Sequence, residues 1–400
     1  MKILVFRIGS LGDTVMALPA LEWIREHYGA ACRIMLLEDK ALGSEVAIRH
    51  LLQGTFYADG FFAYPSGRRN LRFVFSLIDL IWKIRRERFD AVINLAPGQR
   101  TRVALVRDRL FFLLCRIPSF IGFHSFSTDV SYPRQVDGRP APVPSEASFL
   151  LERLTASGLP TGRRMDDPVP RPALRLTATE LQQAETWLEV RRRHPDRPLV
   201  AMAPGVKQPV NQWPVENYAA VGRELVRGGK WELIVIGGMK EIPLQEQLLH
   251  TWKEGIGAAG AFSPRMTAAL LSHCRLFIGP DSGPMHLAAA VGVPCVAIFS
   301  DRDNPGRWHP LGSGHRVIRK SVPCGGCGHS VCPRPDHLCM RSVTVDEVVT
   351  VALQQLSAND QGAVSTTAEG LTRQTGVWPL TPFLPDLSTR DDGAGSQGLV

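Results

Sequence analysis

No stretch of the 400-residue sequence has the length and apolar character of a membrane-spanning helix. The longest apolar runs, residues 71–82 and 110–123, are shorter than the roughly 20 residues that a bilayer requires, and both carry charges. The chain does not begin like a secretory leader either, because Arg7 and a glycine-rich turn follow a short apolar start at once. We therefore expect a cytoplasmic protein, whose eight cysteines are reduced, buried or metal-bound rather than paired.

A nucleic-acid-binding module is also missing, and the basic residues are scattered rather than gathered into a stripe. The sequence has 46 Lys and Arg against 38 Asp and Glu, which gives a net charge of +8. This excess suits an anionic ligand or an anionic membrane surface, but an ordinary basic surface explains it equally well. Four hundred residues exceed one typical hydrophobic core, so we expect two or three domains.

Strand-like and helix-like segments alternate along most of the chain, which predicts an α/β fold with parallel sheets. The expected strands lie at residues 2–6, 32–37, 91–95, 198–203, 231–237, 275–279 and 293–299. The expected helices lie at residues 15–28, 71–88, 214–226, 241–252, 264–274 and 285–291.

The alternation is interrupted once, at residues 127–175, which are rich in proline and arginine and predict a linker with one short helix. We therefore predict a first domain at residues 1–170 and a second at residues 171–357. Residues 358–400 are rich in Gly, Ser, Thr, Asp and Pro, which predicts a mostly disordered tail.

Residues 7–13 (RIGSLGD) connect the first predicted strand to the first helix. Gly9 and Gly12 allow a tight turn and the close approach of a ligand. Asp13 stands at the carboxyl end of the strand, where open α/β sheets bind ligands, and could accept a proton from an attacking hydroxyl. Capping of the helix is the alternative role for Asp13. The third glycine of a dinucleotide-binding loop is missing, and a carboxylate would repel a pyrophosphate, so a proton acceptor is favoured over a phosphate neighbour.

Residues 279–287 (GPDSGPMHL) lie between another predicted strand and helix. The free N–H groups at such a helix start form a binding site for a phosphate. Ser282 and His286 would add hydrogen-bond donors, and Gly283 would permit close approach. The alternative is an ordinary strand–loop–helix turn with a buried histidine.

Two further loops follow predicted strands of the second domain. Glu241, after Gly237 and Gly238, could bridge the two hydroxyls of a ribose or could cap the next helix. Lys207, in the loop after residues 198–203, is a candidate cation for a diphosphate leaving group, and the alternative is a solvated loop lysine.

Four thiols lie close together in the sequence, at Cys324, Cys327, Cys332 and Cys339. They could close a structural zinc site without an open position for catalysis, although their spacing is looser than two C-x2-C pairs. Separately, residues 71–88 combine apolar and basic side chains, which suits either contact with an anionic membrane or a helix that faces the core with a basic outer side.

Taken together, these motifs resemble glycosyltransferase family 9, whose best-known members are the ADP-heptose:lipopolysaccharide heptosyltransferases. The resemblance runs in order from residue 1 to about residue 356 and is most specific at residues 7–13 and at residues 281–290 (DSGPMHLAAA). It implies a GT-B fold, in which two Rossmann-like domains face each other across a central cleft and the second holds most of the donor. It also implies inversion at the anomeric carbon without a metal or other cofactor.

The resemblance also implies roles for individual residues. Asp13 corresponds to the proposed base and Glu241 to the acid that holds the donor's ribose. The other expected donor contacts are Ser10, Gly12, Asp281, Ser282, Gly283, Met285 and His286. The family usually has a lysine where this chain has Asn211, and we expect Lys207 to replace it as a catalytic cation. Inversion is also favoured because Ala289 stands where retaining GT-B enzymes often have a glutamate.

We therefore expect an inverting glycosyltransferase that moves a sugar, heptose from ADP-heptose, to a lipopolysaccharide-core or other saccharide. A lipid-linked acceptor would place the enzyme at the inner membrane face as a peripheral protein, and no nucleic-acid partner is expected. Three alternatives stay open: a protein hydroxyl as acceptor, a non-catalytic sugar-nucleotide-binding protein, and a zinc-stabilised nucleic-acid binder.

Overall fold

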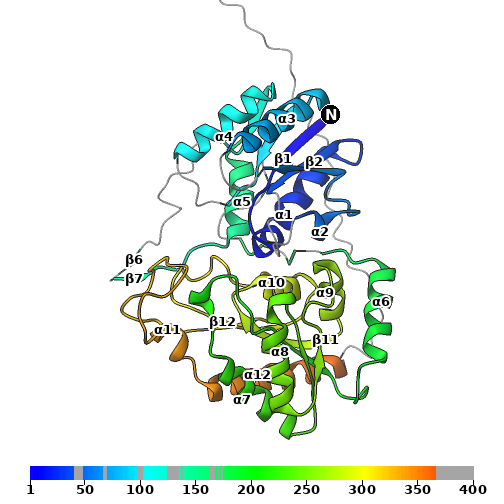
Figure 1. The fold of residues 1–400 in the computed structure, drawn as a ribbon, viewed down its shortest axis with the longest axis vertical. Helices are drawn as coiled ribbons and strands as arrows, with labels where there is room; N and C mark the ends of the chain where they lie inside the picture. Colours follow the sequence, from blue (N-terminus) through cyan, green and yellow to red (C-terminus); the bar gives the residue numbers. More distant parts are fainter. Residues whose placement is uncertain are drawn as a thin grey trace, which may run out of the picture. The chain divides into compact units, whose positions relative to one another are not determined.

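The computed structural model describes residues 1–39, 48–65, 70–97, 102–123, 135–136, 138–159, 161–162, 167–169, 171–172 and 174–365. Two parallel sheets, each packed between helices, form the framework of this part of the chain (Figure 1). Residues 1–359, which contain both sheets, form one compact unit.

The first sheet has five strands in the order β3-β2-β1-β4-β5, and all its pairings are parallel. Its strands are β1 (Lys2–Phe6), β2 (Arg33–Asp39), β3 (Gly60–Tyr64), β4 (Ala91–Asn94) and β5 (Ser119–Ile121). Ile3 and Val5 point into one hydrophobic cluster, and Leu4 and Phe6 point into another. Because both faces of β1 are buried, the strand is a continuous apolar run rather than an alternating one.

Five helices accompany this sheet: α1 (Leu11–Tyr28), α2 (Arg49–Leu52), α3 (Leu71–Glu87), α4 (Arg102–Leu114) and α5 (Glu146–Thr155). Helix α1 begins at the N-cap Ser10 and ends before Gly29, whose φ of 75° suits a glycine at the end of a helix. Helix α5 packs on α1, while α3 and α4 contribute to the cluster on the opposite face of the sheet.

The second sheet has six parallel strands in the order β10-β9-β8-β11-β12-β13. Its strands are β8 (Leu199–Met202), β9 (Glu232–Val235), β10 (Ile256–Gly257), β11 (Cys274–Pro280), β12 (Cys295–Phe299) and β13 (Arg316–Arg319). Its helices are α6 (Ala178–Glu189), α7 (Val215–Arg227), α8 (Ile242–Trp252), α9 (Pro264–Leu271), α10 (Gly283–Ala290), α11 (Leu338–Arg341) and α12 (Val345–Ser365). The short elements are the strands β6 (Gln135–Val136) and β7 (Arg139–Pro140) and the 3-10 helices η2 (Pro209–Asn211) and η3 (Met239–Glu241).

Every strand and helix expected from the sequence is present, with ends that differ by a few residues. The sequence analysis did not predict the strands β3, β5, β6, β7, β10 and β13 or the helices α2, α4, α6, α11 and α12. In α4, apolar side chains lie on the outer face as well as the inner one, and in α6 only Ala184 and Leu188 are fully buried, so neither helix has a clean apolar stripe. The expected short helix of the linker is α5.

The predicted boundary of the tail is wrong for its first residues, because α12 continues to Ser365. The rest of the predicted tail, from residue 366, lies outside the described residues.

A buried arginine joins elements of the two sheets. Arg265, in α9, forms a two-pronged ion pair with Glu180 of α6, with Nε–Oε1 at 2.5 Å and Nη2–Oε2 at 2.6 Å. The same guanidinium donates to the carbonyl of Leu51, in α2, over 3.2 Å. A hydrogen bond from Arg265 holds the pKa of Glu180 at about 2.

A second cross-link is the ion pair between Arg307 and Glu146, whose side chains are 6% and 0% exposed. The two residues also share a backbone bond from Glu146 N to Arg307 O. Because Glu146 opens α5, which packs on α1, this pair connects the loop after β12 to the helices of the first sheet.

We predict that Glu180→Gln destabilises the protein by about 1–2 kcal/mol at neutral pH, because it leaves the charge of the part-buried Arg265 without its acidic partner. The folded-state pKa of Glu180 lies below its ordinary value of 4.5, so the pair's contribution is full above pH 4.5 and is lost as the pH falls toward 2. Thermal unfolding as a function of pH should therefore show a melting-temperature gap between wild type and variant that narrows between pH 4.5 and pH 2. A gap that stays constant over this range would contradict the ion pair.

Candidate functional site

The strand order of each sheet reverses direction at one point, between β1 and β4 in the first and between β8 and β11 in the second. Open α/β sheets bind ligands at the carboxyl ends of the strands at such a point. The loops that leave β1, β8 and β11 there are the ones that carry Asp13, Lys207 and Asp281. The topology therefore indicates ligand binding at the same loops that the sequence motifs indicated.

The loop after β1 is tied together by Ser10 and Asp13. The backbone N and the Oγ of Ser10 both donate to Asp13 Oδ2 over 2.6 Å, and Asp13 N donates back to Ser10 Oγ over 3.5 Å. This is a capping box, so the helix-capping role considered for Asp13 is present in the structure. It occupies Oδ2 and leaves Oδ1 as the oxygen available for chemistry.

Behind Asp13 lies Arg7, whose side chain is fully buried. Its Nη1 donates to the carbonyl of Leu95 over 2.5 Å, and its Nη2 lies 3.9 Å from Asp13 Oδ1. Its Nε and Nη2 have no hydrogen-bond partner among the described residues. Burial lowers the pKa of Arg7, and the charge of Asp13 opposes that shift. Arg7 is thus a cation held in place beside Oδ1. The sequence analysis gave Arg7 no role, although a charged residue directly after a buried strand is a signal that could have indicated one.

Helices α1 and α10 touch at their first turns (Figure 1). A Cβ on Gly12 would lie 2.7 Å from Cδ2 of His286, and a Cβ on Gly283 would lie 2.9 Å from Cδ2 of Leu11. The motifs at residues 7–13 and 281–290 are therefore in direct contact, although about 270 residues separate them in the sequence.

Around α10, His286 is 3% exposed and its Nε2 lies 3.6 Å from Asp281 Oδ1. Asn211 donates from Nδ2 to Asp281 Oδ2 over 3.4 Å, and Ser300 donates to Asn211 Oδ1 over 2.6 Å. Ser282 is the N-cap of α10, yet its buried Oγ makes no capping hydrogen bond and has no partner in the part of the chain that the structure describes. A buried hydroxyl without a partner at a helix start is available to a ligand.

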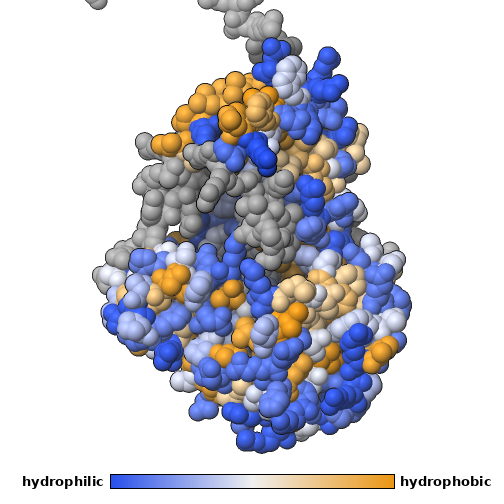
Figure 2. All heavy atoms as spheres, in the orientation of Figure 1, coloured by the Kyte–Doolittle hydropathy of each residue, from blue (hydrophilic) through white to orange (hydrophobic). Residues whose placement is uncertain are grey.

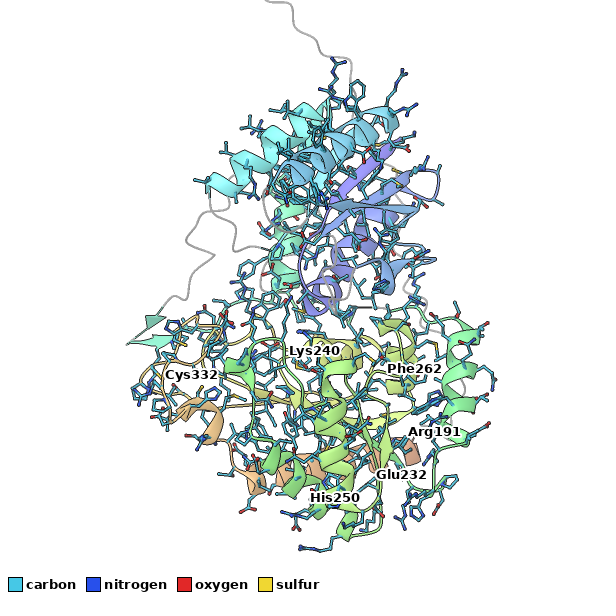
Figure 3. The ribbon with its side chains drawn as sticks, viewed as in Figure 1. Arg191, Glu232, Lys240, His250, Phe262 and Cys332 are labelled. Atoms are coloured by element: carbon cyan, nitrogen blue, oxygen red, sulfur yellow. The ribbon has the colours of Figure 1, made fainter. Side chains whose placement is uncertain are left out.

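Glu241 lies over two glycines of neighbouring loops. A Cβ on Gly205 would come 2.3 Å from Glu241 Cγ, and one on Gly237 would come 2.6 Å from its Cβ. Gly238 N donates to Glu241 Oε2 over 2.7 Å, so this carboxylate also closes the turn at η3. Lys240, labelled in Figure 3, lies beside it at the amino end of α8, opposite the end that carries His250.

The other expected site residues differ in exposure. Lys207 is exposed on the loop between β8 and η2. The side chain of Met285 is fully buried in the hydrophobic core, so this residue can offer a ligand only its backbone.

The structure does not support the predicted zinc site. In residues 174–365, which include all four thiols, no three His, Cys, Asp or Glu side chains are placed to hold a metal ion. Cys339 is buried, Cys327 is exposed, and Cys332 lies on the loop before α11 (Figure 3). Burial raises the pKa of the Cys339 thiol.

Comparison with known proteins gives one family match. A family model described as glycosyltransferase family 9 (heptosyltransferase) matches residues 77–337. Lipooligosaccharide heptosyltransferase 2 of Haemophilus influenzae is 29% identical over 163 residues, which are 38% of this chain and 46% of that protein. The matched region spans about half the length, or less, of this and three similar curated heptosyltransferases.

Two solved structures share the fold. A family 9 glycosyl transferase from Veillonella parvula has a TM-score of 0.66 and 21% identity, and the match covers 89% of this chain and 97% of that one. The ADP-heptose lipopolysaccharide heptosyltransferase II of Escherichia coli has a TM-score of 0.67 and 19% identity, covering 90% and 100%. These matches, with the two parallel sheets, confirm the predicted GT-B fold.

We predict that Gly12→Ala destabilises the protein by about 1–3 kcal/mol, since its new methyl group would press on the buried His286 ring. Gly228→Ala is the matched control, because a Cβ there meets nothing within 4 Å and its φ of −76° suits alanine. Denaturant unfolding checks both variants. Equal stability of the two would mean that α1 and α10 do not touch at Gly12, and His286→Ala should restore part of the loss.

Proposed function

The chain belongs to glycosyltransferase family 9, and on that premise we propose that it transfers heptose from ADP-heptose to a saccharide of the lipopolysaccharide core. The observation that carries the proposal is the contact between the first turns of α1 and α10. It puts a carboxylate able to take a proton beside a helix start able to bind a diphosphate. These are the two groups that a displacement at an anomeric carbon requires.

On the donor side, we assign the diphosphate to the start of α10. The N–H groups in the first turn of a helix have no partner within the helix and point toward a bound anion. Gly283 and Met285 contribute such groups, while Pro284 has none. The unpartnered Oγ of Ser282 adds a donor, and His286 and Asp281 line the same loop.

On the acceptor side, we assign the base to Asp13 through Oδ1. The acceptor oxygen forms a bond to the anomeric carbon while the bond from that carbon to the phosphate oxygen breaks. The acceptor's proton passes to Asp13, and the bonding electron pair leaves with the nucleoside diphosphate. A single displacement of this kind inverts the anomeric carbon. Arg7 holds the carboxylate in place from behind, and Ser10 and Gly12 shape the loop around it.

The negative charge that develops on the leaving diphosphate needs stabilisation in the transition state. In this proposal the α10 N-terminus and Lys207 supply it without a divalent metal. Asn211 cannot act as a cation, and it already binds Asp281 and Ser300. Glu241, next to Gly205 and Gly237, is assigned to the ribose hydroxyls of the donor.

The acceptor in this proposal is a lipid-linked saccharide, which the enzyme meets as a peripheral protein on the cytoplasmic side of the membrane. The neutral Asn211, where the family usually has lysine, favours a second candidate, a sugar-nucleotide-binding protein without transferase activity. Measurement of transfer separates the two.

We predict that Asp13→Asn lowers kcat for heptosyl transfer by about 10²–10⁴-fold, because the amide cannot accept the acceptor's proton. Its carbonyl oxygen can still accept the hydrogen bonds of the capping box. The melting temperature of Asp13→Asn should therefore stay closer to wild type than that of Asp13→Ala, which loses the cap as well.

The measurement is release of ADP and formation of glycosylated product with ADP-heptose and a core saccharide. If Asp13→Asn retains wild-type kcat, Asp13 is only a helix cap. If the wild type binds ADP but transfers no sugar, the binding-protein candidate is favoured.

A further inference from the structure

Helices α3 and α4 expose an unusual number of large apolar side chains. Of the seventeen large hydrophobic residues that are exposed in the described part of the chain, ten lie on these two helices. They are Leu71, Val74, Phe75, Ile78 and Trp82 on α3, and Val103, Val106, Leu110, Leu113 and Leu114 on α4. Figure 2 shows hydrophobic side chains gathered over α3 and α4. We call these ten residues the α3–α4 face.

The α3–α4 face is ordered by the helical repeat. On each helix its members follow one another at intervals of three or four residues, apart from the adjacent pairs Val74–Phe75 and Leu113–Leu114, so they form one stripe per helix. The buried residues of the same helices, such as Leu80 and Ile84 on α3 and Phe111 on α4, point the other way, into the core of the first sheet. The exposed stripes are therefore not the core-packing sides of these helices.

The two stripes belong to one surface. Both helices pack on the same hydrophobic cluster, and the Nε of Arg85 on α3 donates to the carbonyl of Leu114 on α4 over 2.6 Å. Large exposed apolar side chains that gather on one surface are uncommon on monomeric proteins and indicate an interaction site.

The charges around the face indicate its partner. The two helices carry seven Arg and Lys and three Asp and Glu. Of the acids, Asp108 is buried and pairs with Arg107, Asp79 pairs with Lys83, and Glu87 pairs with Lys2. By the helical repeat, Arg72, Lys83 and Arg86 flank the α3 stripe, and Arg107 and Arg109 lie on opposite sides of the α4 stripe. A second copy of the chain would place two positively charged surfaces against each other, so the charges disfavour a dimer through this face.

Beside the α3 stripe, a cavity of about 610 Å³ opens between α3 and the edge strand β3. Arg72, Lys83 and Asp79 line it together with Phe73 and Asn70, and Asp79 is paired with Lys83. A phospholipid headgroup has the anionic charge that suits Arg72 at this rim. An apolar stripe with exposed Trp and Phe, bordered by cations, is typical of a surface that lies at a lipid–water interface.

We infer that the α3–α4 face docks the protein on a bilayer rich in anionic phospholipid. The exposed apolar side chains enter the boundary between headgroups and acyl chains, and the flanking cations pair with lipid phosphates. No helix in the described ranges is long and apolar enough to cross a membrane, which leaves docking from one side. Both helices cover the sheet whose strand β1 leads to Asp13.

This inference rests on the proposed function only for the identity of the acceptor. Its test is co-sedimentation of the full chain with vesicles of phosphatidylcholine alone and of phosphatidylcholine with phosphatidylglycerol. We expect binding to the anionic vesicles that weakens as salt rises. The paired substitution Arg72→Gln with Arg86→Gln should weaken binding about fivefold per charge removed.

A matched pair of single substitutions tests the apolar stripe. Val103, on the face, is 79% exposed, and Val190, after α6, is 80% exposed. Val103→Asp should reduce partition into anionic vesicles by about tenfold or more, and Val190→Asp should not change it. Both variants should keep the wild-type melting temperature, because both side chains are outside the core. Equal vesicle binding by the two variants, or no binding by the wild type, would overturn the inference.

Two further readouts separate this inference from the proposed function. Val103→Asp should transfer heptose to a delipidated core saccharide like wild type but lose transfer to the same acceptor in vesicles. If wild type binds anionic vesicles but transfers no sugar, docking stands and the proposed activity fails. If the wild type is a dimer that Val103→Asp separates, a second copy covers the face and docking on a bilayer is wrong.

Discussion

The contact between the first turns of α1 and α10 is the constraint on which the site depends. It exists because two helix starts present glycines to each other, so Gly12 accommodates His286 and Gly283 accommodates Leu11. Each helix start has free N–H groups and a positive partial charge, and two such ends repel each other unless anions lie nearby. Asp13 at one end and Asp281 at the other provide those anions. Asp13 is also the residue assigned as the base, and Asp281 lines the loop assigned to the donor's diphosphate.

Buried cations hold the surrounding elements in register with this contact. Arg7 fixes the loop after β1, and the ion pair of Arg307 with Glu146 connects the loop after β12 to α5. Arg265, which is paired with Glu180, donates to the carbonyl of Leu51 in α2 and so connects α9 to the first sheet. Such pairs contribute little net stability over an apolar core, but breaking one leaves a buried charge, so they favour one relative position of the elements. That position is the one that brings the loop after β1 to the loop after β11.

The sequence predicted the alternation of strands and helices because both faces of each sheet are buried, which leaves unmistakable apolar strands such as β1 and β12. It predicted the site loops because polar and glycine residues end those strands. It did not predict α4, because the exposed leucines and valines of this helix hide its helical period. The expected metal site at the cysteines was not supported. Spacing along the chain does not show that Cys327 is exposed while Cys339 is buried. The contact between Gly12 and His286 depends on tertiary structure. The family resemblance predicted only that both residues contact the donor, not that they touch each other.

Binding of nucleotides tests the central claim most directly, namely that the start of α10 beside Gly12 holds the donor's diphosphate. Calorimetric titration with ADP, GDP and UDP should show ADP binding most tightly, with His286→Ala weakening it about tenfold, as expected for the loss of one or two good hydrogen bonds. Asp13→Asn should leave ADP affinity unchanged, because its role is assigned to the acceptor. Absence of nucleotide binding, or equal affinity of wild type and His286→Ala, would contradict the assignment of the donor site.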